Sequence, residues 1–325
     1  MVEEEIDKKW ENDLQAKFQE KINSLIKDSC EKFDTKLITF EKDIKEKIDN
    51  SFNVNQIKNQ MNKICRNLAY NNYGNNLITA VLLCLSNIEP FVFYFLDKKN
   101  SKNGKNYCSL FVELLDNLWT KPGDKFEPNL IHNQLKETNN QVYKSKNPGT
   151  IIKFFLSQLH EELNSDTSNN TEISKLFFVK YKNEQIPLVN LNVIKGAKSI
   201  ISDYHFNLLD NNADIEDLNN NILIINLNRE RDPLHQIKIE YPENLEVKIK
   251  GENKKYELIS VLFKTNIKLK DDYNYSEQPK YKVCFKNFFN QKWYSYDQNI
   301  ELIGTKNILD DGQKTLLLVY KKKID

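Results

Sequence analysis

Cysteine, glycine and proline are all scarce in this chain of 325 residues, which has five cysteines, eight glycines and eight prolines. The cysteines are Cys30, Cys65, Cys84, Cys108 and Cys284, and none of them forms a CxxC pair. We therefore expect reduced thiols in the cytosol or the nucleus, and neither a disulfide framework nor a cysteine-based zinc finger. The acidic start, MVEEEIDKKW, has no apolar core of a signal peptide.

The chain also lacks an excess of charge of one sign and a long uncharged apolar run. It has 47 basic and 46 acidic residues, a net charge of +1, which argues against a nucleic-acid partner. The segment Leu77–Leu96 is about as long as a membrane span, but Ser86, Asn87, Glu89 and Pro90 interrupt it. We predict a buried helix, a turn and a second apolar segment there, and no contact with a membrane.

Motifs for phosphate, metal or serine chemistry are missing as well. The sequence contains no GxGxxG, GxxxxGK[ST], GxSxG or HExxH. The four histidines do not stand at metal-ligand spacing from a cysteine or from one another. In the run His160-Glu161-Glu162 the side chains of a helix would point in different directions, so a solvated helix end is the expectation. We predict no cofactor and no metal.

The first 73 residues contain neither glycine nor proline. Their apolar positions, from Ile6 to Ile48, recur about every 3.8 residues, which is typical of a helix. Residues 1–50 have ten basic and fourteen acidic residues, a net charge of −4. We predict a long helix or a helical pair over residues 1–66. Two interpretations fit its apolar stripe: packing against the rest of the chain, or docking on a protein partner or a second copy.

The rest of the chain changes from helical to β-rich patterns. Residues 74–163 have mostly helical patterns, including Phe111–Trp119 and Ile151–Leu163. Residues 164–171 form a polar stretch typical of a loop. Short runs typical of strands follow, at Leu176–Lys180, Ile222–Leu227, Ile237–Tyr241, Tyr256–Phe263, Lys280–Phe285, Lys292–Tyr296 and Thr315–Tyr320. The pattern predicts an α+β protein in which a helical lobe precedes a β lobe.

Eight segments, in order, resemble the ubiquitin-specific proteases, the papain-like cysteine deubiquitinases. Asn67–Leu96 ends in LCLSNIEPFVFYFL, which resembles the first box of that family, GLxNLGNTCYMNSxLQxLSNIPPxxxYFL. Asn147–Asn164 resembles QDAxEFLxxLLDxLHEEL, and Lys280–Gln298 resembles HYxxYxRxxxxxWYxFDD. The other five are Phe111–Trp119, Ile222–Arg229 (ILIINLNR), Ile239–Leu245, Tyr256–Lys264 and Leu316–Tyr320 (LLLVY).

The resemblance implies a papain-like fold of the ubiquitin-specific protease type. Residues 67–163 would be a helical thumb, 164–221 reduced fingers, and 222–325 a β palm, all preceded by the helical extension 1–66. The fingers of the family often carry two CxxC pairs on zinc, whereas residues 164–221 contain no cysteine. A short, metal-free version is implied, and its polar composition suggests loops more than a long hairpin.

The resemblance also places the family's active-site positions on this chain. The nucleophilic cysteine falls on Asn76 and the general-base histidine on Lys280. Asp297 matches the acid that orients the histidine, and Asn71 matches the oxyanion donor. An amide has no ionisable nucleophile, and a lysine with an ordinary pKa is a cation at neutral pH rather than a base. Two alternatives fit Lys280: an ion pair with Asp297 that replaces the contact between histidine and acid, or a solvated lysine.

The implied function is that of an inactive ubiquitin-specific-protease-like protein. It would bind ubiquitin or a ubiquitin-like protein, or act as a subunit that docks through residues 1–66 in a larger complex. The alternative is an active cysteine deubiquitinase, a ubiquitin C-terminal isopeptidase, with a non-standard nucleophile.

Overall fold

The computed structural model describes two units of the chain, Met1–Asn59 and Gln60–Asp325. The described residues are 21, 32, 36, 39, 55–59, 61, 63, 65, 67–68, 76–97, 106–121, 125–164, 171–181, 184–192, 215–217, 220–229, 239–249, 252–267, 278–296, 300–309 and 315–323. In the first unit, residues 55–59 are helical. The predicted stripe from Ile6 to Ile48 lies outside the described residues.

The first half of the second unit is helical, as the sequence patterns predict. A two-residue parallel pair, β1 (Asn67–Leu68) with β2 (Lys125–Phe126), accompanies the helices. The helices are α2 (Asn76–Leu85), α3 (Glu89–Asp97), α4 (Tyr107–Trp119), α5 (Asn129–Thr138), α6 (Asn140–Tyr143), α7 (Pro148–Leu163) and α8 (Glu172–Phe177). The predicted helices at Phe111–Trp119 and Ile151–Leu163 are confirmed as the main parts of α4 and α7.

The apolar segment Leu77–Leu96 forms α2 and α3, which meet at an angle of 87°. Residues 86–88 separate the two helices, so the predicted break is confirmed. No single helix in the described part of the chain is long and apolar enough to cross a membrane.

A large sheet makes up most of the second half. Its strands lie in the order β12-β11-β10-β9-β13-β7-β5, with β8 paired to the first part of β9. Only β5 and β7 pair in parallel, and the other pairs are antiparallel. The strands are β5 (Val189–Asn192), β7 (Ile222–Asn228), β8 (Asn244–Ile249), β9 (Glu252–Ile267), β10 (Gln278–Lys286), β11 (Trp293–Tyr296), β12 (Ile300–Ile303) and β13 (Thr315–Lys322). Helix α9 (Thr305–Leu309) precedes β13.

The region between α7 and β7 differs from the expectation of loops. It contains α8 and a small sheet of three short strands in the order β4-β3-β6. These strands are β3 (Val179–Tyr181), β4 (Glu184–Ile186) and β6 (Ile215–Asp217), while β5 joins the large sheet. The predicted strand Leu176–Lys180 is wrong in its first half, because α8 continues to Phe177. At Ile237–Tyr241, the described residues 239–241 hold a single bridge residue, Glu240.

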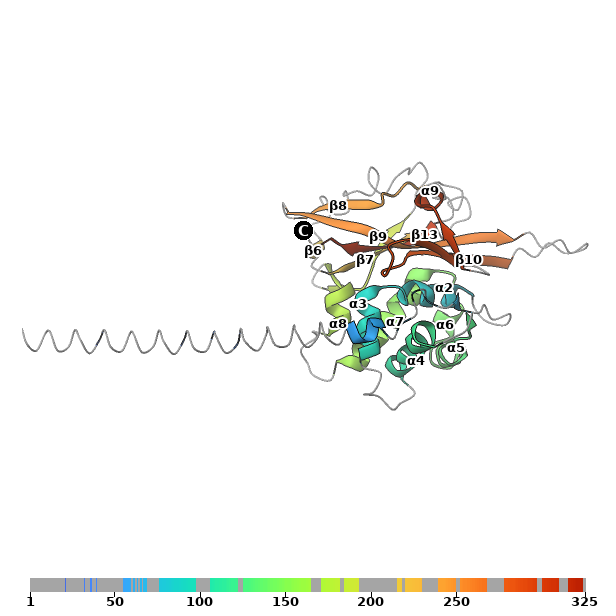
Figure 1. Cartoon of the computed structure of the whole chain (residues 1–325), viewed down its shortest axis with the longest axis horizontal. Coiled ribbons are helices and arrows are strands. Elements are labelled where there is room, and N and C mark those ends of the chain that lie inside the picture. Colours follow the sequence, from blue (N-terminus) through green and yellow to red (C-terminus); the bar gives the residue numbers. More distant parts are fainter. Residues whose placement is uncertain are drawn as a thin grey trace, which may run out of the picture. The chain divides into compact units, whose positions relative to one another are not determined.

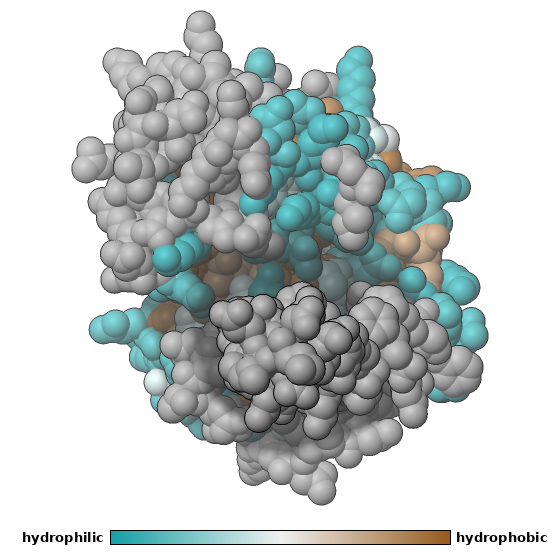
Figure 2. Space-filling model, turned by 90° about the vertical axis from the view of Figure 1, so that its left-hand side faces the viewer, coloured by the Kyte–Doolittle hydropathy of each residue, from teal (hydrophilic) through white to brown (hydrophobic). Residues whose placement is uncertain are grey.

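The helices and the large sheet form two layers (Figure 1). Helix α2 packs against β9 and β10, and α7 packs against β7 and β13. The opposite face of the sheet has its own apolar core, to which α9 contributes Ile308 and β8 contributes Leu245 and Val247. On the side of the molecule seen in Figure 2, the described surface is mainly hydrophilic, and few hydrophobic side chains are in view.

Candidate functional site

The first residue of helix α2 is Asn76, the position that the sequence assigns to the nucleophile. The side chain is partly buried, and its Oδ1 atom is buried without a hydrogen-bond partner among the described residues. The first N–H groups of a helix have no partner within the helix, so this end of α2 carries partial positive charge. A cysteine here would have its thiolate stabilised by the helix, whereas the Asn76 amide stays neutral and cannot use that field.

The residue assigned to the general base, Lys280, lies near the beginning of β10. In the pairing of β10 with β9, Lys280 stands opposite Thr265, and Tyr281 stands opposite Lys264. Tyr281 is 5% exposed, and burial raises the pKa of its hydroxyl. The structure describes the backbone of Lys280 but not its side chain.

The contacts of α2 show that Asn76 and Lys280 lie toward the same end of the sheet. Cys84 is two turns after Asn76, about 12 Å along the helix, and its Sγ lies 3.6 Å from Ser260 Oγ of β9. Lys264 is four residues after Ser260, about 13 Å along the strand.

The other end of α2 fixes the direction. Asn87, just after α2, lines one pocket with Glu257 and Ile259 of β9. The last turn of α2 therefore lies toward the beginning of β9, and the first turn lies toward Lys264 and its neighbours on β10. Figure 1 shows α2 beneath β10 in this part of the sheet.

The other two predicted site residues, Asn71 and Asp297, lie outside the described residues. The proposed ion pair between Lys280 and Asp297 consequently remains a prediction.

All four described cysteines are buried: Cys65, Cys84, Cys108 and Cys284 are at most 1% exposed. Burial raises the pKa of the Cys84 thiol to about 12, so this thiol is protonated at neutral pH. The Ser260 hydroxyl that contacts Cys84 also donates a hydrogen bond to the Cys284 carbonyl at 3.2 Å. These cysteines have the surroundings of core residues, which are chemically inert.

The two motif positions of the second resembling segment, Asn147 and Thr150, lie at the beginning of helix α7. Asn147, at the place of the motif's aspartate, is the N-cap of α7, and its Oδ1 accepts a hydrogen bond from the Gly149 N–H at 2.8 Å. Thr150, at the place of the motif's glutamate, is exposed. The capping contact needs only an oxygen acceptor, which explains why asparagine can stand where the family has aspartate.

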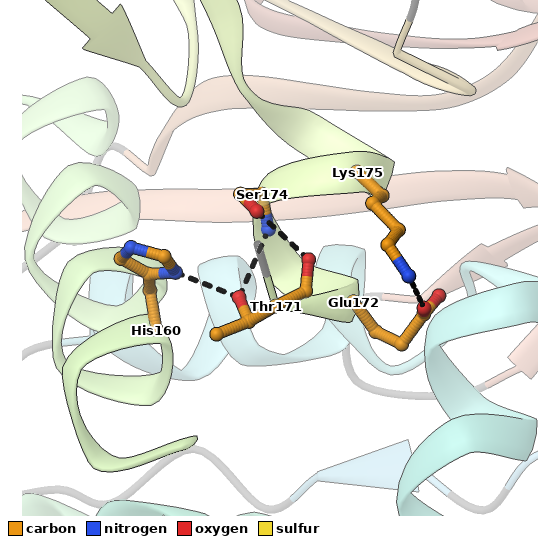
Figure 3. Close-up of polar contacts among 5 residues, drawn as sticks. All are labelled: His160, Thr171, Glu172, Ser174 and Lys175. Carbon is orange, nitrogen blue, oxygen red and sulfur yellow. Dashed lines mark hydrogen bonds and ion pairs between the residues drawn. The ribbon is translucent and has the colours of Figure 1, made fainter. Parts of the chain in front are cut away.

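The run His160-Glu161-Glu162 at the end of α7 does not gather into one cluster. His160 Nδ1 lies 2.6 Å from Thr171 Oγ1, and Thr171 is the N-cap that accepts from the Ser174 N–H (Figure 3). The Thr171 hydroxyl has one donor and two acceptor sites, so it can accept from the Ser174 N–H and also pair with Nδ1 of the His160 ring. Burial lowers the pKa of His160, which favours the neutral ring.

Glu162 does not contact Thr171 as His160 does, but caps the N-terminal end of α4. Its two carboxylate oxygens accept from the N–H groups of Tyr107 and Cys108 at 2.9 and 2.8 Å. Glu161 is exposed. The expectation of a solvated helix end is therefore correct for Glu161 and wrong for His160 and Glu162, because both join α7 to neighbouring helices. Sequence patterns could not reveal the Glu162 contact, since its partners lie more than 50 residues away.

The sequence model of the ubiquitin carboxyl-terminal hydrolase family matches residues 65–320. No curated protein matches the chain. The crystal structure of an essential yeast splicing factor is similar, with a TM-score of 0.61 and 14% identity over 81% of this chain and 70% of that one. The SAGA Ubp8/Sgf11/Sus1/Sgf73 DUB module bound to ubiquitin aldehyde matches with a TM-score of 0.58 and 14% identity, over 82% of this chain and 69% of that one.

These similarities confirm the predicted fold class. The helical layer and the large sheet correspond to the thumb and the palm of the papain-like fold of the ubiquitin-specific protease type. At identities this low, the structural similarity establishes the fold alone.

Proposed function

Because this chain belongs to the ubiquitin carboxyl-terminal hydrolase family, we propose that it is a catalytically inactive member that binds ubiquitin or serves as a subunit of a protein complex. The observation that carries the proposal is Asn76 at the first position of α2. The family's reaction begins with the attack of a thiolate on the carbonyl of the ubiquitin C-terminus, and a carboxamide cannot make that attack.

The general-base position supports the same conclusion. Lys280 lies on β10, at the end of the sheet toward which the first turn of α2 points. A lysine ammonium has no lone pair with which to accept a proton, so it cannot activate a nucleophile at neutral pH. In triad proteases the loss of the nucleophile or the base alone lowers the rate by about a millionfold.

A substitute nucleophile finds no support among the cysteines that the structure describes. A reactive cysteine is partly exposed and has a lowered pKa, whereas Cys84 is fully buried and has a pKa of about 12. An active enzyme would need either Cys30, which lies outside the described residues, or a large rearrangement of the core.

Two of the similar structures suggest what kind of partner this chain has. One is a DUB module bound to ubiquitin aldehyde, and the other is an essential splicing factor. We propose that the thumb and the palm of this chain retain a surface for ubiquitin or a ubiquitin-like protein, and that residues 1–66 dock on a further protein in the cytosol or the nucleus.

A hydrolysis assay tests the loss of activity. Full-length protein is mixed with ubiquitin that carries a fluorophore on its C-terminus, and we expect no release of the fluorophore. Turnover that disappears after thiol alkylation would contradict the proposal and would point to one of the five cysteines.

An Asn76→Cys variant tests the ubiquitin site separately. A ubiquitin probe with a thiol-reactive electrophile at its C-terminus should leave the wild-type protein unmodified and label the Asn76→Cys variant. The control is Asn129→Cys, an exposed position at the beginning of α5, which should not react. If neither variant is labelled while both remain folded, ubiquitin does not enter this site and the subunit role alone remains.

A further inference from the structure

A pocket with a volume of about 410 Å³ lies at the end of α2 opposite Asn76. It is formed by the turn after α2, by β9, by the end of β13 and by the last residue of β10 with the turn that follows. Its lining residues are Asn87, Glu89, Glu257, Ile259, Lys286, Phe288, Gln291 and Lys321–Lys323. Asn76 and Asn87 are eleven residues apart, or about 16 Å along a helix. The pocket is therefore separate from the site of the family's chemistry.

The glutamates of the pocket already have lysine partners. Lys286 forms an ion pair with Glu257 and lies 3.9 Å from Glu243, just outside the pocket. Lys321 Nζ lies 2.6 Å from Glu89 Oε2. Both glutamates of the lining are therefore paired, and the four lysines of the lining against two glutamates give it a net charge of +2, which favours an anionic ligand.

The other two lysines of the lining, Lys322 and Lys323, form a basic rim. The backbone N–H of Lys323 donates to the carbonyl of Lys255 at 2.8 Å, which places the beginning of β9 beside the end of β13. Lys322 and Lys323 have no ion-pair partner in the part of the chain that the structure describes. A carboxylate that meets two such ammonium groups gains attraction without breaking an existing pair.

The pocket also has an apolar surface that is held in place. Ile259 and Phe288 line it. The centroid of the Phe288 ring lies 4.7 Å from the ring centroids of both Trp119 and Phe289. The Trp119 Nε1–H donates to the Ser86 carbonyl at 2.8 Å, which ties this aromatic group to the turn after α2. A side chain fixed by such packing gives a ligand a rigid surface.

Asn87 adds a polar side chain of which only the Nδ2 group has a hydrogen-bond partner among the described residues. It is 4% exposed, and its Nδ2 donates to the Leu83 carbonyl at 2.8 Å. Its Oδ1 is buried and accepts no hydrogen bond from the described residues. Buried acceptors are normally satisfied, so Asn87 is an incompletely satisfied polar residue in the wall of the pocket.

We propose that this pocket binds an acidic peptide segment of a partner protein. Carboxylates of the peptide pair with Lys322 and Lys323, and an apolar side chain lies against Ile259 and Phe288. A free inorganic anion would contact the lysines but not the apolar surface. The near-zero net charge of the chain argues against nucleic acid as the ligand.

The experiment measures the binding of a fluorescein-labelled peptide of about ten residues, rich in glutamate and aspartate with a central leucine and phenylalanine. It uses full-length protein and fluorescence anisotropy. Binding should weaken about tenfold when the acidic residues become glutamine and asparagine, and also when NaCl rises from about 50 to about 300 mM. Charge reversal in Lys322→Glu/Lys323→Glu should weaken binding about tenfold or more, and the milder Lys322→Ser/Lys323→Ser should weaken it less.

The matched control is Lys136→Glu/Lys153→Glu, which makes the same charge change at exposed positions of α5 and α7. It should change the dissociation constant less than about twofold. Three results would each overturn the proposal. The two charge reversals could weaken binding equally, the neutral peptide could bind as tightly as the acidic one, or inorganic phosphate could compete for the pocket as well as the unlabelled acidic peptide does. Labelling of Asn76→Cys by the ubiquitin probe should be the same with and without the rim substitutions, so failure at this pocket is distinguishable from failure of the proposed function.

Discussion

Gly149 of α7 and Asn226 of β7 are so close that a Cβ atom on residue 149 would lie 2.5 Å from Asn226 Nδ2. Asn226 is fully buried and donates to Asn190 Oδ1 of β5 at 2.8 Å. The contact therefore joins the first turn of α7 to the sheet, and it leaves room only for glycine.

Gly149→Ala should destabilise the protein by about 1–3 kcal/mol, because the new methyl group must displace a buried amide and strain its hydrogen bond to Asn190. Chemical denaturation at neutral pH measures the change. Gly304→Ala is the matched control, since a Cβ there would meet nothing within 4 Å, and its effect should stay within about 0.5 kcal/mol. Equal stability of the two variants would show that α7 and β7 are less tightly packed than the 2.5 Å distance implies.

The buried histidine His132 should make stability depend on pH. Its Nε2 lies 3.1 Å from Thr79 Oγ1, its Nδ1 has no partner among the described residues, and burial lowers its pKa to about 4. Between about pH 6.5 and pH 4 the unfolded chain binds a proton here and the folded chain does not, so the free energy of unfolding falls as pH falls. The full effect is about 3 kcal/mol, and it is present above pH 6.5.

Carboxylates also titrate at low pH, so the measurement is a difference. Wild type and His132→Gln are unfolded by urea at several values between about pH 7.5 and pH 4.5. The variant is less stable at pH 7.5, but the gap should narrow as the pH falls. A constant gap would mean that His132 is accessible to protons in the folded protein.

The sequence predicts the architecture well where an element carries its own signal. The Asn106 side chain caps α4 by accepting from the Ser109 N–H, and α7 begins at Pro148. Both helices lie where the pattern places them. The segment Leu176–Lys180 is ambiguous because one apolar run covers the end of α8 and the beginning of β3. Periodicity cannot divide so short a run between a helix and a strand.

The candidate site is predictable only in part. The resemblance assigns the nucleophile and base positions to Asn76 and Lys280, and the structure has these residues at the beginning of α2 and on β10. The roles of both positions stay predictions. The basic pocket could not be predicted, because its walls come from Asn87 and from Lys321–Lys323, more than 230 residues apart. No local pattern encodes a contact at that separation.

Removal of metal ions should leave the protein intact. The interval 164–221, where the family's fingers lie, contains no cysteine and a single histidine, His205, whereas a structural zinc site needs four such ligands. A chelator should therefore not change the melting temperature, and metal analysis should find no stoichiometric zinc. A lower melting temperature with chelator, restored by added zinc, would contradict this expectation.

Glu162 should stabilise the helical lobe through its two hydrogen bonds to the first N–H groups of α4. Glu162→Ala leaves the N–H groups of Tyr107 and Cys108 without their acceptor and removes a negative charge from the positive end of the helix. We expect a loss of about 1–2 kcal/mol. Glu162→Gln keeps one acceptor oxygen without the charge, so its effect should be smaller.

Glu161→Ala is the control on the adjacent residue. Glu161 is exposed, and its carboxylate accepts from Gln158 Nε2 at 3.0 Å on the surface of the same helix. Its replacement should change the free energy of unfolding by less than about 0.5 kcal/mol. Urea denaturation of the three variants at low and high salt separates the terms, because the charge effect at the helix end is screened and the hydrogen bonds are not. If Glu161→Ala costs as much as Glu162→Ala, the carboxylate of Glu162 does not cap α4.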